Sequence, residues 1–424
     1  MFPRSFPVFF LALVCFCLLP LPEARAGDPA EDAPGLGSRA AVLLDAATGT
    51  LLYTKNQDET IPPASLTKLM TIHLALNEVK AGRLSPDEPL SPPRESWAIN
   101  QPPRSSLMFL AAGQRVSLRE LLLGLAIPSG NDAAVAVALR LAPSAEAFAA
   151  LMNREARRLG LVNTYFVEPS GISEYNVTTA LEFARFCRVY LSLHPETLAE
   201  LHSVPEFAYP KPENVGEAYR DRPGTIVQYN HNRLLGKVEG VDGLKTGYID
   251  EAGYNIALTA ERKGTRFIAV LLGAPAGHGG DRIRDEDGRN LLTWGFDHFK
   301  TLRPETGPLP PLRVWKGRTD WVPVIPGEPL EFTVYAERGN VLNREIVPAD
   351  PVVAPLPADS IVGTLILSDD MGELRRIPLV SAEAVPAGTW WKRFRDGLAL
   401  SFRSLARRME AIRQDGGSSS GGSS

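Results

Sequence analysis

A serine and a lysine three residues apart, Ser65 and Lys68, form the first pair of side chains here that could carry out covalent chemistry. Pro62 and Pro63 break the chain before them, and residues 65–79 then predict a helix whose first turn holds both side chains on one face. A serine hydroxyl becomes a useful nucleophile when a base takes its proton, and burial can lower a lysine pKa enough for that task. The pair alone is weak evidence, because serine at a helix start more often caps the helix.

A second polar cluster, Ser129-Gly130-Asn131, follows Pro128 and interrupts a region of helical periodicity. A loop between two helices can aim a hydroxyl and an amide at one point. Ser129 could then pass a proton to a leaving amine, and Asn131 could hold a substrate carbonyl or the lysine. Taken alone, the tripeptide is better explained as a polar turn between helices.

A third cluster, Lys245-Thr246-Gly247, lies in a stretch with strand character. Gly247 has no side chain, so the backbone of a ligand can approach closely, and an extended peptide can add to the strand edge by main-chain hydrogen bonds. Lys245 and Thr246 would then face a terminal carboxylate. The simpler alternative is an exposed lysine on an edge strand.

The elements that must position these clusters are strands at both ends of a mostly helical region. The economical fold pairs an early hairpin with three late strands in one sheet, and the middle helices form a separate lobe across a cleft. Capping-box spacing occurs at Ser117 and Glu120 and again at Thr179 and Glu182, and Gly160 is a helix stop. The expected strands cover 39–44, 50–53, 244–248, 254–262 and 266–273, and the expected helices cover 65–79, 117–127, 132–141, 144–159 and 281–299.

A proline-rich stretch over 301–311 predicts a linker, and short strands separated by proline and glycine follow it. Together these features predict a small all-β domain over 301–388 with a structural role. Its expected strands cover 312–315, 321–324, 331–335, 361–367 and 377–380.

Residues 389–414 predict an amphipathic helix that begins with tryptophan and carries basic residues around one apolar face. Such a helix suits the surface of an anionic bilayer, and the alternative is a helix packed on the protein's own core. Residues 415–424 are almost all glycine and serine and predict a disordered tail. The apolar face consists of Trp391, Phe394, Leu398, Phe402, Leu405, Met409 and Ile412.

Residues 1–26 predict a secretory signal peptide. Arg4 precedes an apolar run over 8–19 that is too short to span a bilayer comfortably, and Ala24-Arg25-Ala26 supplies a cleavage site before Gly27. A retained signal anchor is the alternative. Of three cysteines only Cys187 lies beyond this segment, so no disulfide is expected within the mature chain, and the net charge of -4 excludes a global electrostatic case for binding nucleic acid.

In this order, the three clusters match S-x-x-K, S-x-N and K-T-G, the motifs of penicillin-binding proteins and related β-lactamases. The sequence resembles the low-molecular-mass D-alanyl-D-alanine carboxypeptidases of bacterial cell walls, a family of serine peptidases. The resemblance implies an α+β fold: a β-lactamase/transpeptidase-like domain over 27–300, with an antiparallel sheet flanked by helices plus a helical lobe. The all-β domain and the C-terminal amphipathic helix match the family more loosely. The matching segments are Pro62–Met70, Ser129–Ala134, Val241–Gly247 and Leu292–Phe296.

The resemblance also implies roles for the residues of the motifs. Lys68 accepts the proton of Ser65, which attacks the carbonyl between two terminal D-alanines, while backbone N–H groups, that of Ser65 included, bind the oxyanion. Ser129 helps protonate the departing D-alanine, and water then hydrolyses the acyl-enzyme. A β-lactam would leave Ser65 acylated. No cofactor and no metal are implied. The residues expected to bind the substrate are Asn131, Lys245, Thr246 and Gly247.

The expected partners are a peptidoglycan stem peptide ending in D-Ala-D-Ala, β-lactam antibiotics and a membrane surface contacted through residues 390–414. Nucleic acid is not expected. The implied location is the periplasm, at the outer face of the cytoplasmic membrane, with the C-terminal helix as a peripheral anchor.

Other functions stay open at this point. A class A-like β-lactamase needs a glutamate between the second and third motifs to activate the deacylating water, and Glu168 is the nearest candidate, although its Glu-Pro-Ser-Gly context is wrong. A transpeptidase, which passes the acyl group to an amine instead of to water, is hard to distinguish from a carboxypeptidase by sequence. A catalytically inactive wall-binding module is a further alternative, against which the intact motifs argue.

Overall fold

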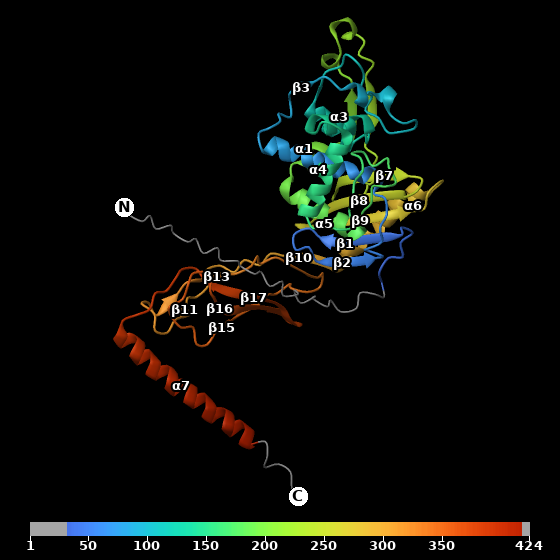
Figure 1. Cartoon of the computed structure of the whole chain (residues 1–424). Coiled ribbons are helices and arrows are strands. Elements are labelled where there is room, and N and C mark those ends of the chain that lie inside the picture. The colour runs from blue at the N-terminus through green and yellow to red at the C-terminus, as the bar shows by residue number, and fades with distance from the viewer. Residues whose placement is uncertain (1–31, 418–424) are drawn as a thin grey trace, which may run out of the picture. The chain divides into compact units, whose positions relative to one another are not determined.

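The computed structural model describes residues 32–417, so the predicted signal peptide and most of the predicted glycine- and serine-rich tail lie outside the described residues. A five-stranded antiparallel sheet in the order β2-β1-β9-β8-β7 joins the two ends of the first domain (Figure 1). The early hairpin therefore pairs with the late strands, which confirms the predicted sheet. Its strands are β1 (Ala40–Asp45), β2 (Leu51–Lys55), β7 (Val241–Ile249), β8 (Gly253–Arg262) and β9 (Thr265–Ala274).

Both faces of this sheet are covered, and alternate residues of one strand enter different hydrophobic cores. In β1, Val42 and Leu44 belong to the core shared with the middle helices, whereas Ala41 and Leu43 belong to the core that includes residues of α6 (Gly280–His298). A strand buried on both faces is apolar throughout instead of alternating. This explains the unbroken apolar run over β1.

The middle helices do not form a lobe with its own core. One hydrophobic cluster runs from the sheet residue Val270 through Phe183 and Leu69 to Leu125, so the sheet and the helices share it. Within it, α5 packs against β1 and β9. One core therefore joins the predicted helical lobe to the sheet. The helices of this region are α1 (Lys68–Lys80), α2 (Leu118–Ala126), α3 (Asn131–Leu141), α4 (Ala145–Arg158) and α5 (Ala180–Leu193).

Local capping explains where several of these helices begin. Ser117 and Glu120 form the predicted capping box at α2, with each side chain accepting from the backbone N–H of the other residue. At α5 the second predicted box is only half formed. The Thr179 hydroxyl accepts from the Glu182 N–H at 3.1 Å, but the Glu182 carboxylate accepts instead from the backbone of Asn163 at 2.8 Å.

Two short pairs of antiparallel strands in this region were not predicted because the strands are too short to show a period. They are β3 (Pro89–Leu90) with β4 (Val116–Ser117), and β5 (Glu206–Tyr209) with β6 (Ile226–Tyr229).

The all-β domain has a core of its own and a four-stranded sheet in the order β13-β17-β16-β15. The predicted linker is wrong at its start, because β10 (Phe299–Leu302) pairs with β14. Strand β15 was missed because most of its residues are exposed, so its sequence shows no apolar alternation. The strands are β11 (Leu312–Arg313), β12 (Trp321–Val322), β13 (Val324–Pro326), β14 (Phe332–Tyr335), β15 (Asn343–Pro348), β16 (Ile361–Asp369) and β17 (Gly372–Ser381).

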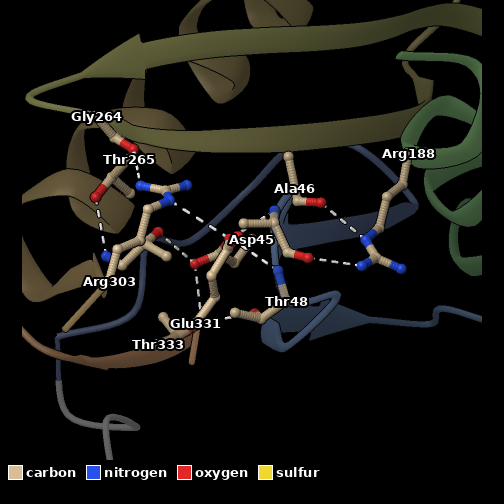
Figure 2. A network of polar contacts seen from close by, with 11 residues as sticks. Asp45, Ala46, Thr48, Arg188, Gly264, Thr265, Arg303, Glu331 and Thr333 are labelled. Carbon is tan, nitrogen blue, oxygen red and sulfur yellow. Dashed lines mark hydrogen bonds and ion pairs between the residues drawn. The ribbon is translucent and has the colours of Figure 1, made fainter. Parts of the chain in front are cut away.

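A buried carboxylate links the first sheet to the β10–β14 pair (Figure 2). Asp45, at the end of β1, is fully buried, and its Oδ2 accepts from the hydroxyls of Thr301 at 2.6 Å and Thr333 at 2.8 Å. Its Oδ1 accepts from the Ala47 N–H at 2.8 Å. A buried charge requires such donors, so these bonds hold β10 and β14 at this corner of the sheet.

The last helix, α7 (Trp390–Gly417), extends three residues past its predicted end. The buried Asp396 carboxylate near its start accepts from the Lys316 N–H at 2.8 Å, and Arg403 forms an ion pair with Asp350 at 3.1 Å. Among residues 32–417, no single helix is long and apolar enough to cross a membrane. The pair α3 and α4 passes that test only together and is bent by 83°.

Candidate active site

Ser65 lies in a 3₁₀ turn, η1 (Ala64–Thr67), that leads directly into α1. The helix predicted from residue 65 is thus a 3₁₀ turn over residues 65–67, and the Ser65 side chain makes no capping bond. Its Oγ instead accepts from the Nζ of Lys68 at 2.9 Å. Ser65 is partly exposed and Lys68 fully buried, so the hydroxyl is accessible while the amine is not.

The amine of Lys68 is surrounded by three acceptors. Besides Ser65, it donates to Asn131 Oδ1 at 2.8 Å and to the backbone carbonyl of Ser170 at 2.6 Å. Burial lowers the pKa of Lys68 to about 7, while the nearby charges of Glu168 and Asp132 oppose that shift. A lysine with such a pKa is neutral in a large fraction of molecules at neutral pH, as a proton acceptor must be.

The second motif lies directly before α3. Ser129 has φ 62°, a left-handed conformation that is strained for a residue with a side chain. The loop is held by backbone bonds from Gly130 to Gly124 and from Asn131 to Ser106, both at 2.8 Å. The Ser129 hydroxyl is buried and has no hydrogen-bond partner within residues 32–417, which leaves it available to a ligand.

The aspartate that follows this motif was missed at the level of sequence. The buried Asp132 carboxylate accepts from the backbone N–H groups of Met108 at 2.9 Å and Leu110 at 3.0 Å. It thereby fixes the segment that lies against the Ser129 loop. Burial raises the pKa of Asp132, and the backbone hydrogen bonds oppose that rise.

The third motif lies on β7, the last strand of the sheet, which pairs with β8 on one side. Lys245 and Thr246 are buried, and the Lys245 Nζ donates to the carbonyl of Thr246 at 3.1 Å. Burial, and next the charge of Lys68, place the pKa of Lys245 well below its usual range. Two lysines thus share one low-dielectric region, which an anionic ligand would stabilise.

A third cation adjoins this pair and was not predicted. Arg284 of α6 is 5% exposed, its charge also lowers the pKa of Lys245, and its guanidinium lies 5.8 Å from the ring centre of Tyr254. It forms an ion pair with Asp285 at 2.6 Å. In the sequence Arg284 is one of several charged residues in the predicted helix, and its burial is visible only in the structure.

Two glycines let the backbone of other segments press against η1. A Cβ at Gly247 would lie 2.9 Å from the Ser65 nitrogen, so the K-T-G strand passes directly beside the serine. A Cβ at Gly171 would lie 1.8 Å from the carbonyl oxygen of Ala64, and Gly171 has φ 85°. Both positions therefore require glycine.

We expect Gly171→Ala to lower the free energy of unfolding by roughly 3 kcal/mol and to reduce activity, because the methyl group collides with the backbone of η1. Gly160 is the matched control, since it has φ 75° with open space around its Cβ position. Gly160→Ala should cost about 1 kcal/mol. Chemical denaturation of both variants measures the difference, and equal losses would contradict the proposed contact.

The structure brings most of the predicted residues to one place. Lys68 contacts Ser65 and Asn131 directly. Gly247 lies against the Ser65 backbone, and Lys245 and Thr246 are its neighbours on β7. Ser129 is two residues from Asn131. The carbonyl of Ser170 is a contact that the sequence analysis missed, because a backbone oxygen leaves no mark in a motif.

The carboxylate of Glu168, the candidate base for a β-lactamase, already accepts several hydrogen bonds from the protein. Its carboxylate accepts from the backbone N–H groups of Ser170 at 2.7 Å and Gly171 at 2.6 Å, and from the Ser170 hydroxyl at 2.6 Å. A carboxylate with these donors is poorly placed to activate a water molecule. The arrangement gives no support to the β-lactamase alternative.

Comparison with known proteins agrees with this geometry. Residues 28–276 match the family model described as D-alanyl-D-alanine carboxypeptidase, and residues 308–387 match the one described as penicillin-binding protein 5, C-terminal domain. The chain is 34% identical over 394 residues to the D-alanyl-D-alanine carboxypeptidase DacC of Escherichia coli, with 91% of this chain and 94% of the relative covered.

Solved structures give the same result for the fold. Penicillin-binding protein 5 from Haemophilus influenzae superposes with a TM-score of 0.72 at 27% identity, covering 83% of this chain and 98% of that one. Penicillin-binding protein D2 from Listeria monocytogenes, in its cefotaxime-bound form, superposes with a TM-score of 0.53 at 32% identity, covering 62% of this chain and 98% of that one. The predicted α+β fold with its separate all-β domain is confirmed.

Proposed function

This chain belongs to the D-alanyl-D-alanine carboxypeptidase family, and from that premise we propose that it removes the terminal D-alanine from peptidoglycan stem peptides through an acyl-enzyme at Ser65. The observation that carries this assignment is the hydrogen bond from a buried lysine with a lowered pKa to a partly exposed serine. The experiment that tests it measures D-alanine release from a peptide ending in Lys-D-Ala-D-Ala, with mass spectrometry of the penicillin-treated protein.

In the acylation step, the neutral amine of Lys68 takes the proton from Ser65 Oγ while Oγ forms a bond to the substrate carbonyl carbon. The backbone N–H of Ser65, at the start of η1, stabilises the developing oxyanion. The C–N bond then breaks, and the buried hydroxyl of Ser129 delivers a proton to the departing D-alanine. Ser129 takes in turn the proton that Lys68 accepted, which returns the lysine to its neutral form. Water hydrolyses the resulting ester and regenerates Ser65. A β-lactam follows the first half of this sequence and leaves the serine acylated.

Substrate recognition follows from the charge and the backbone of β7. The carboxylate of the terminal D-alanine binds Lys245 and Thr246, and the buried Arg284 adds positive charge beside them. The peptide lies along the edge of β7 and adds to it by main-chain hydrogen bonds, while Gly247 keeps this strand close to Ser65. Asn131 holds the substrate amide in addition to Lys68. A buried lysine such as Lys245 is costly to keep charged without an anion, so an anionic terminus is the natural ligand.

We also propose that the protein is exported and attached to the outer face of the cytoplasmic membrane by α7. The apolar side chains of this helix are exposed, including Trp391 at 63%, Phe394 at 50% and Phe402 at 71%. This exposure argues against a helix packed on the protein's own core. Basic residues on the same helix suit anionic headgroups.

Removal of the chain from Trp390 onward should release the protein from vesicles that contain anionic phospholipid. A finer variant, Phe394→Glu with Phe402→Glu, should weaken binding by about tenfold or more, because it places two charges on the apolar face. Trp321→Glu is the control, since Trp321 is 56% exposed on the all-β domain. Sedimentation with vesicles measures binding, and unchanged pelleting of the truncated protein would rule out the anchor.

A further inference from the structure

The orientation of the Lys68 amine depends on more than the three motifs. A neutral lysine amine has two N–H donors and one lone pair. Asn131 Oδ1 at 2.8 Å and the Ser170 carbonyl at 2.6 Å can take the two N–H groups, which leaves the lone pair directed at Ser65 Oγ, 2.9 Å away. Whatever holds the Ser170 carbonyl therefore helps to aim the base.

The carboxylate of Glu168 holds that carbonyl in place. It accepts from both the backbone N–H and the hydroxyl of Ser170, at 2.7 and 2.6 Å, and from the N–H of Gly171 at 2.6 Å. These bonds fix the peptide unit that contains the Ser170 carbonyl, through the Gly171 N–H, and the peptide unit before it, through the Ser170 N–H. The Glu168 side chain thus positions the Lys68 amine indirectly, through the Ser170–Gly171 backbone.

The same carboxylate is joined to the catalytic turn by a second route. The fully buried Asn176 donates to Glu168 Oε1 at 2.8 Å and lies 3.2 Å from the hydroxyl of Thr67 in η1. The hydroxyl of Thr71 in α1 donates to the Pro169 carbonyl at 2.7 Å. Loop 168–176 is therefore docked on the two elements that carry Ser65 and Lys68.

Charge gives Glu168 a second effect. Its negative charge raises the pKa of Lys68, as does that of Asp132 on α3, and both oppose the larger effect of burial. Two further titratable groups interact electrostatically with Lys68: Lys245 on β7 and His231 in the loop before that strand. The pKa of each is lowered by burial and, among other charges, by that of Lys68. Glu168 lies on the loop that also positions the amine, whereas Asp132 fixes the 108–110 segment.

We propose that Glu168 is a positioning residue for acylation: its carboxylate holds the Ser170 carbonyl against the Lys68 amine. The inference rests on the proposed function, because it requires Lys68 to be the base. It assigns to Glu168 a role different from the activation of a deacylating water, for which its carboxylate has no suitable free position.

The test compares Glu168→Gln with the wild-type protein in the rate constant for acylation by a fluorescent penicillin, measured from pH 5 to 9. Loss of the negative charge favours the neutral amine, so the acid limb of the profile should shift to lower pH by about one unit. The plateau at higher pH should fall about tenfold, because the amide cannot accept all the bonds that hold the turn. Glu168→Asp keeps the charge and should retain the wild-type midpoint with a reduced plateau.

Glu182→Gln is the matched control. Its carboxylate also accepts several bonds, from Asn163 and Thr164, but it is not among the charges that act on Lys68. This variant should lose thermal stability without a shifted midpoint. An unchanged midpoint in Glu168→Gln, or an equal shift in Glu182→Gln, would overturn the inference.

The experiment also distinguishes a folding defect from a failure of the proposed function. If Glu168→Gln does not accumulate as folded protein, Glu168→Asp decides: a reduced plateau supports the inference and a wild-type plateau overturns it. If the wild-type protein itself is not acylated at Ser65, the proposed function fails. If it is acylated and the glutamate variants behave as wild type, only the role of Glu168 fails.

Discussion

Ser65→Ala should abolish the covalent adduct with a labelled penicillin and lower D-alanine release by roughly 10⁴-fold or more, because it removes the hydroxyl that we propose forms the acyl bond. Ser65 is the partly exposed hydroxyl that accepts from the buried Lys68 amine at 2.9 Å. Intact-mass spectrometry after penicillin treatment measures the adduct, and amino-acid analysis measures D-alanine.

Ser96→Ala provides the matched control for this substitution. Ser96 is fully buried, and its hydroxyl donates to the Pro93 carbonyl at 2.7 Å, so its removal also costs a buried hydrogen bond. We expect slightly lower stability with normal labelling. Penicillin labelling that persists in Ser65→Ala would show that the nucleophile lies elsewhere.

Lys68→Met should slow acylation by about 10²- to 10⁴-fold, the usual contribution of a general base. Methionine fills a similar volume but accepts no proton from Ser65. It also leaves Asn131 Oδ1 and the Ser170 carbonyl without the donor that they share in the wild-type protein. Some loss of thermal stability should therefore accompany the loss of rate.

The acylation rate of the wild-type protein should depend on pH in the direction that a lysine base requires. Burial lowers the pKa of Lys68 to about 7, and only the neutral amine can accept a proton. Acylation should therefore rise with pH through about 7 and become constant above it. The acid limb should be absent from the residual reaction of Lys68→Met. A residual rate with the same acid limb would assign it to another group.

Lys55→Met separates the role of the base from the general loss of hydrogen bonds made by a lysine amine; Lys55 is half-buried. The Lys55 amine donates to the carbonyls of Leu36 at 2.7 Å and Ser38 at 2.8 Å, within the same domain. We expect a lower melting temperature and an unchanged acylation rate. Equal slowing in both lysine variants would indicate a general structural effect.

Much of the fold could be predicted because the signals are local and strong. The capping box at Ser117 and the helix stop at Gly160 lie within a few residues of the bonds that they make. Short or exposed strands escaped prediction: β15 has mostly exposed residues, and β10 lies across the end of the predicted helix and the start of the predicted linker. Their pairing partners supply the stabilisation that their own sequences do not show.

The family, the three motifs and the order of the elements that carry them could be predicted before the fold was known, since these depend on residue type and spacing. The surroundings of the Lys68 amine could not, because they are assembled by folding. The Ser170 carbonyl, Glu168 and Arg284 reach this region from segments distant in sequence. A pKa depends on burial and on charges across space, and a backbone carbonyl belongs to every residue type, so neither can be read from a motif.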